Sequence, residues 1–229
     1  MRLLLSIICV LIFAATALCA DELLDRMVAT VNSHVILLSD LQDEIRFECL
    51  SSGQTVAGVT PAQSKAALDR LIDQELVAEQ MRAADAKPIP PGQLQAQVQS
   101  IKAEILKGNP GRTWDELLSR CQTSQTLVDD RIKKEVEQLQ FIDARFRPSI
   151  QISPGEIEQY YKEQLVPKLP PADPVSLSDA SPKIREILVQ EKINQALSSW
   201  LETLRSQAQI QFFSAAAEAR SSSFLEETR

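Results

Sequence analysis

The side chains that could do chemistry in this sequence are few, and they do not form a catalytic pattern. The one histidine, His34, lies at a predicted turn, where we expect it to be exposed. No serine or cysteine lies in a nucleophile motif, and the six glycines are scattered, so none forms a phosphate-binding loop. The carboxylates of DRLIDQE and DDRIKKEVE favour i,i+4 ion pairs with Lys and Arg. The sequence therefore predicts no catalytic residue, no metal site and no cofactor.

Four aromatic residues are candidates for contact with a ligand. Tyr160 and Tyr161 could stack on one, but packing of one ring inward with the other exposed is the simpler interpretation. Trp114 and Trp200 lie on the apolar faces of predicted helices, so we expect both in the core. Apolar positions that build a core can equally line a crevice, so no substrate-binding residue is assigned.

Two cysteines outside the leader, Cys49 and Cys121, are candidates for a disulfide. An oxidising compartment would permit the bond. Each residue also lies on the apolar face of a predicted helix, so two buried free thiols are the alternative. No CxxC or Cys/His spacing indicates metal or redox chemistry.

Residues 1–20 are predicted to be a cleavable signal peptide. Arg2 precedes an apolar run that ends in small residues and is followed by no stop-transfer charges. Cleavage is predicted after Ala20; lipidation at Cys19 is the alternative, although Leu18 is bulky for a lipidation motif. Removal leaves 23 basic and 31 acidic residues, a net charge of −8. Such acidity disfavours nucleic acid and anionic head groups as partners. No further apolar run follows the leader, so we expect the mature protein to be soluble.

The order of predicted elements indicates a mainly α protein with a small β-sheet. Residues 28–31 and 34–37 form a predicted hairpin with a turn at Asn32–Ser33. Helices follow, and the last begins near Ser181 and precedes the strand AQIQFF. Because an isolated hairpin is marginal in water, we expect this strand to pair with it and join both ends of the mature chain. Predicted helix N-caps are Ser39, Thr60, Thr113 and Ser153.

Several segments, in their order, resemble the SurA family of periplasmic chaperones. LLDRMVATVNSHVILLSDLQDEI is similar to the family's first hairpin and helix, and LDRLIDQELVAEQM to its second long helix. DDRIKKEVEQLQFI and ISPGEIEQYYKEQ resemble later helices. IREILVQEKINQALSSWLETLRSQAQIQFF resembles the C-terminal helix and strand. The similarity covers residues 22–213 and depends on the order of these motifs more than on any one of them.

The sequence departs from the family where most relatives carry a parvulin-type prolyl isomerase domain. Only 23 positions separate Tyr161 from Ile184, which is too few for such a domain. The resemblance therefore implies a multi-helix chaperone core with the hairpin near its N-terminus. The implied organisation is a helical chaperone domain at 21–165, a Pro-rich linker at 166–181, a C-terminal helix and strand packing back on the core at 182–213, and a disordered tail at 214–229.

The function implied by the resemblance is that of an ATP-independent periplasmic chaperone. It would bind unfolded exported or outer-membrane polypeptides in an apolar crevice and prevent their aggregation. Two alternatives remain: a peptidyl-prolyl cis-trans isomerase, as relatives are, and a dedicated interaction subunit for one envelope partner. We expect no enzyme activity, no nucleic-acid partner and no stable membrane insertion after signal cleavage.

Overall fold

The computed structural model describes residues 25–52, 55–168 and 175–213. The predicted signal peptide, the predicted tail and residues 169–174 of the predicted linker lie outside these residues. Helices dominate the described chain, which confirms the mainly α class. The α-helices are α2 (Leu38–Ser52), α3 (Pro61–Ala83), α4 (Pro91–Gly108), α5 (Trp114–Arg120), α6 (Gln125–Phe146), α7 (Pro154–Tyr160) and α8 (Leu177–Gln207).

Both ends of the described chain meet in one antiparallel sheet, as predicted. Strands β1 (Met27–Val31) and β2 (His34–Leu37) form the hairpin, and β3 (Ile210–Phe212) pairs with the free side of β1. Asn32 adopts a positive φ of 53° in the turn. Its backbone N–H donates to the carbonyl of Gln209 at 2.9 Å, and its side-chain oxygen accepts from the Gln209 N–H at 2.9 Å. The hairpin turn therefore fixes the register of the C-terminal strand.

Three of the four predicted helix caps are confirmed. The side chains of Thr60, Thr113 and Ser153 each accept a hydrogen bond from the backbone N–H of the third helical residue. The side-chain oxygen of that residue accepts one from the backbone N–H of the cap. Such reciprocal bonds satisfy backbone N–H groups that the first helical turn leaves unpaired.

The predicted cap at Ser39 is wrong, because α2 begins one residue earlier, at Leu38. The Asp40 carboxylate accepts from the backbone N–H of Leu37 at 2.8 Å, and the Ser39 hydroxyl instead donates to Asp25. The helix therefore follows β2 directly, with no room for a separate capping residue.

The predicted start of the last helix is also wrong, because α8 begins at Leu177 and contains Pro182. Ser176 caps it by accepting from the N–H of Asp179 at 3.2 Å. Pro182 is the sixth residue of α8, so it lies beyond the first turn and lacks the N–H that would bond to the carbonyl of Ser178. The last residues of the predicted 166–181 linker are thus helical, and Val166–Lys168 form a short 3₁₀ helix.

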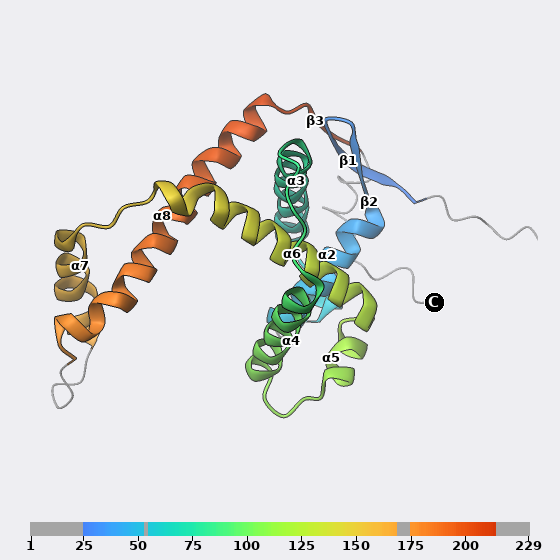
Figure 1. Cartoon of the computed structure of the whole chain (residues 1–229). Helices are drawn as coiled ribbons and strands as arrows, with labels where there is room; N and C mark the ends of the chain where they lie inside the picture. The colour runs from blue at the N-terminus through green and yellow to red at the C-terminus, as the bar shows by residue number, and fades with distance from the viewer. Residues whose placement is uncertain (1–24, 53–54, 169–174, 214–229) are drawn as a thin grey trace, which may run out of the picture.

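The molecule has a main body and a projecting arm (Figure 1). The largest apolar cluster unites the inner face of the sheet with α2 to α6 and the C-terminal end of α8. The arm consists of residues 147–168 with the first half of α8, and its small cluster includes Ile152, Ile157, Ala180 and Ile184. A third cluster with Val77, Ile142 and Ile193 joins α3, α6 and α8 where the arm meets the body.

Charged contacts also attach α8 to the body. The Arg205 side chain donates to Asp73 at 2.6 Å and to the carbonyl of Asp69 at 2.8 Å, which links α8 to α3. Arg147 bridges Asp143 and Glu186, and so links the end of α6 to α8. The hydrogen bond to Asp73 raises the pKa of Arg205.

The arm contains a carboxyl with a strongly shifted pKa, that of Glu156 at the start of α7. A hydrogen bond from Lys192 of α8, then bonds from Ser153, lower this pKa from 4.5 to about 2. The Lys192 Nζ lies 2.6 Å from Glu156 Oε1 and also donates to the carbonyl of Gln151. Because the folded-state pKa is lower than the unfolded one, the stabilisation is present above about pH 4.5 and is lost as pH falls towards 2.

We therefore expect the Glu156 carboxyl to titrate near pH 2 in the folded chain. An NMR titration of the side-chain carboxyl carbon checks this value. Lys192→Met should raise the pKa of Glu156 towards its ordinary value, because the strongest hydrogen bond to the carboxylate is lost. An ordinary pKa in the unsubstituted chain would contradict the arrangement of α7 on α8.

Candidate functional site

The polar residues considered first in the sequence do not form a reactive cluster. The side chain of His34 is 53% exposed, and its Nε2 lies 3.5 Å from Oε2 of Glu75. Glu75 also pairs with Arg82 at 2.6 Å. Among the described residues, no three His, Cys, Asp or Glu side chains come together as metal ligands would.

The four aromatic candidates are all partly buried. Trp114 packs beside the main cluster, donates to the side-chain oxygen of Gln125 and has the Lys102 ammonium 4.8 Å from its ring. Trp200 packs edge-on against Phe146 with ring centroids 5.6 Å apart. Both tryptophans are thus at the margin of the core rather than inside it.

The two tyrosines differ from the prediction. Tyr160 and Tyr161 are both half-buried against the apolar cluster of the arm, so neither ring is left exposed. The Tyr161 hydroxyl donates to the carbonyl of Val175 at 2.6 Å. This bond joins the chain before the predicted linker to Val175 within it, which explains why the second ring also turns inward.

Cys49 and Cys121 form a disulfide with their Cα atoms 5.6 Å apart. Cys49 comes from α2, and Cys121 follows the last residue of α5. Both residues are buried, with 5% and 0% of their surfaces exposed. The sequence left open a disulfide or two buried free thiols, and the structure contains the disulfide.

A buried carboxylate, Glu44 of α2, organises the contact between α2, α3 and α6. Only 3% of its surface is exposed. Arg131 of α6 holds it through two hydrogen bonds of 2.8 and 3.3 Å, and Arg70 of α3 donates at 3.4 Å. Arg70 also pairs with Glu48, and the Arg131 guanidinium lies 4.9 Å from the ring centroid of Phe47. Buried ionised groups need such partners, because removal from water is costly.

This ion-pair network forms one wall of a hollow of about 300 Å³ on the surface. Three apolar side chains, Phe47, Leu139 and Ile142, line it together with polar groups, and Leu139 is 54% exposed. We call it the α2–α3–α6 groove. Its full lining is Glu44, Phe47, Glu48, Ser51, Arg70, Gln74, Arg131, Glu135, Gln138, Leu139 and Ile142.

A second hollow of about 130 Å³ adjoins the groove. Glu48 and Arg70 line both hollows, so their ion pair is a shared wall. Along α3 the lining residues run from Gln63 through Ala66 to Gln74. At about 1.5 Å of rise per residue this stretch is about 17 Å long, which matches about five residues of extended chain at 3.3 Å each.

The pKa of Glu48 reflects its position on this shared wall. Burial raises the pKa above the ordinary value of 4.5, and the nearby charge of Glu44 adds to the shift. Arg70 opposes the shift and only partly offsets it. The charged form of Glu48 is therefore incompletely compensated within the groove.

The position of Glu44 in the sequence already indicates that its side chain is buried. Glu44 lies three residues after Leu41 and next to Ile45, so it occupies the buried face of α2. A carboxylate on an apolar helical face requires a cationic partner, and Arg131 directly precedes the buried Ile132. Which arginine would pair with which glutamate depends on helix packing and cannot be read from one sequence.

Two further findings concern membrane-spanning helices and similar proteins. None of the described helices has the length and apolarity needed to cross a membrane. No family model matches the sequence, and no curated protein matches it either.

Proposed function

We propose that this chain is an ATP-independent periplasmic chaperone that binds unfolded exported polypeptides, including those of the outer membrane, and prevents their aggregation. The observation that supports the proposal is the α2–α3–α6 groove. It combines apolar side chains with hydrogen-bonding groups, and together with the adjoining hollow it has the length of a short extended segment. Unfolded chains present the same mixture of apolar side chains and unpaired backbone amides.

The side chains around the groove suit a site that must both bind an unfolded polypeptide and release it. Leu139 is exposed beside the half-buried ring of Phe47, so a bound apolar side chain would gain a modest area of contact. Burial of apolar surface contributes about 25 cal/mol per Å², so partial burial gives weak binding. Weak binding allows release without a chemical energy source.

The arrangement of elements agrees with the resemblance drawn from the sequence and supports the same proposal. The hairpin, the first helices and the returning C-terminal strand form one body. The chain between Lys168 and Leu177 is too short for an isomerase domain. We therefore assign the chain a role in binding and propose no catalytic step.

The proposal predicts that the chain suppresses light scattering when a denatured outer-membrane polypeptide is diluted from urea. Leu139→Ser should raise the concentration for half-maximal suppression about fivefold, which corresponds to about 1 kcal/mol of apolar contact. The matched control is Leu127→Ser, since Leu127 is also exposed on α6 but does not line the groove. Circular dichroism of both variants establishes that they are folded.

Three outcomes would count against this function. Absence of suppression would reject a holding role. Equal suppression by both variants and the unsubstituted chain would reject the groove as the site. If the chain isomerises a short prolyl peptide above background, the isomerase function is favoured instead. If it captures one folded partner and has no affinity for denatured chains, the role of an interaction subunit is favoured.

A further inference from the structure

The charges that line the α2–α3–α6 groove do not balance. Three carboxylates, those of Glu44, Glu48 and Glu135, face two guanidinium groups, those of Arg70 and Arg131. Arg131 is committed to the buried Glu44 through two hydrogen bonds, and Arg70 divides its donors between Glu44 and Glu48. The lining therefore carries one negative charge in excess.

The excess charge is located on the accessible carboxylates. Glu135 is 43% exposed, and its nearest cation is Arg131, at 3.6 Å. Glu48 is 39% exposed and shares Arg70 with Glu44. Burial is the largest cause of the raised pKa of Glu48; Arg70 opposes the shift, and the charge of Glu44 adds to it. A second cation beside either carboxylate would stabilise its charged form.

Apolar contact is available next to these carboxylates. Glu135 and Leu139 are one helical turn apart on α6, so their side chains lie on the same face. Phe47 and Glu48 are adjacent on α2, and all four side chains line the groove. Side chains two positions apart on an extended peptide lie on one face of it, so they could reach an apolar surface and a carboxylate at the same time.

We propose that the α2–α3–α6 groove selects extended polypeptide segments in which an apolar residue and a lysine or arginine are two positions apart. Phe47 and Leu139 receive the apolar side chain, and Glu48 and Glu135 receive the cation. This selection rests on the proposed function and specifies which unfolded segments the groove binds. Segments with an acidic residue in place of the lysine or arginine are disfavoured by the same carboxylates.

Three fluorescent peptides test the selection. They are capped at both ends and identical except that Lys, Gln or Glu stands two positions after the central Phe, with Gly and Ser elsewhere. At low ionic strength we expect the Lys peptide to bind about tenfold more tightly than the Glu peptide, with the Gln peptide between them. The ratio should fall towards one at high salt, because exposed charges are then screened.

Two variants separate the groove from the acidity of the whole chain. Glu135→Gln should reduce the Lys-to-Glu ratio about threefold and leave the Gln peptide unchanged. Glu104→Gln removes an equivalent charge from an exposed pair on α4 that does not line the groove, and it should change nothing. Equal effects of the two variants would overturn the selection, because the preference would then arise from net charge alone.

The peptide results also distinguish this inference from the proposed function. If the chain suppresses aggregation but binds the three peptides equally, or binds none of them, the selection is overturned and the holding function remains. If it neither suppresses aggregation nor binds any peptide, both are overturned. Ordered affinities that depend on Glu135 support the selection.

Discussion

Reduction of the Cys49–Cys121 disulfide is expected to lower the free energy of unfolding by about 4 kcal/mol. The two cysteines are 72 positions apart, and closing a loop of that length removes much conformational entropy from the unfolded chain. The bond also joins α2 to the end of α5 inside the main apolar cluster. Its loss would therefore weaken the wall of the groove that α2 provides.

Urea denaturation with and without reductant measures this effect. Neither cysteine should react with an alkylating reagent in the denatured chain unless it has first been reduced. The matched control is the double variant Cys49→Ala and Cys121→Ala, whose stability should not respond to reductant. Labelling of both residues in unreduced, denatured protein would show that the bond does not form.

Replacement of the buried Glu44 by Gln is expected to cost about 3 kcal/mol of unfolding free energy. Gln preserves the size of the side chain but leaves Arg131, which is 19% exposed, without its principal counter-charge. The exposed pairs elsewhere in the molecule are worth about 1 kcal/mol or less. The difference arises because Glu44 is buried and holds three helices through two arginines.

A double-mutant cycle measures the contribution of this pair. Arg131→Met in the Glu44→Gln background should recover part of the lost stability, because the uncompensated cation is removed. Glu104→Gln serves as the control, since Glu104 is 72% exposed and pairs only with Lys107 in the structure. A cost for Glu44→Gln no larger than that of the control would contradict the organising role of the buried carboxylate.

Much of the fold could be predicted from local sequence signals. Capping residues marked the starts of α3, α5 and α7, and β-prone residues on both sides of a two-residue turn marked the hairpin. The pairing of β3 with β1 followed from the instability of a lone hairpin. The predicted start of α8 near Ser181 was wrong, because Ser176 provides the cap and the helix begins at Leu177.

The groove could not be predicted in the same way. Phe47, Arg70 and Leu139 belong to three helices that are far apart in the sequence. Their meeting depends on how α2, α3 and α6 cross, and helix packing is only loosely constrained by residue spacing. The apolar periodicity of α6 also predicts that Leu139 is buried like the other apolar residues of the same face. In the structure Leu139 is 54% exposed.

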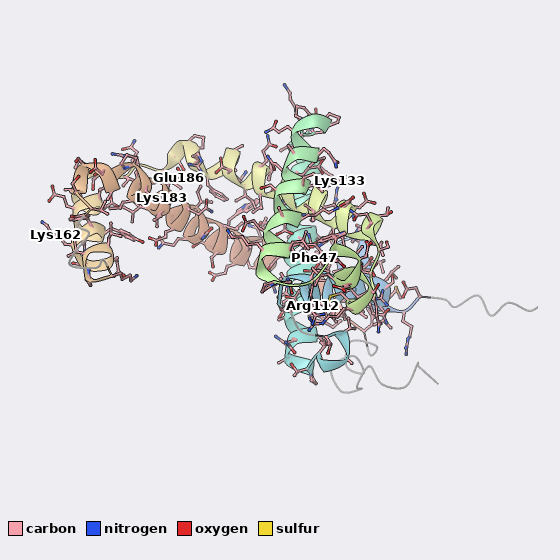
Figure 2. The ribbon with its side chains drawn as sticks, turned by 90° about the horizontal axis from the view of Figure 1, so that it is seen from below. Phe47, Arg112, Lys133, Lys162, Lys183 and Glu186 are labelled. Carbon is pink, nitrogen blue, oxygen red and sulfur yellow. A yellow bond between two sulfur atoms is a disulfide. The ribbon has the colours of Figure 1, made fainter. Side chains whose placement is uncertain are left out.

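The most direct test of the account is a site-specific cross-link to an unfolded polypeptide. A photoreactive phenylalanine is placed at Leu139 in the groove or at Lys183, an exposed position on the arm. Figure 2 shows that Lys183 lies on the arm beside Glu186, well separated from Phe47 in the main body. Illumination with a denatured outer-membrane polypeptide should give a cross-link from position 139 and little from position 183. Equal cross-linking from both positions, or cross-linking from position 183 alone, would contradict binding in the groove.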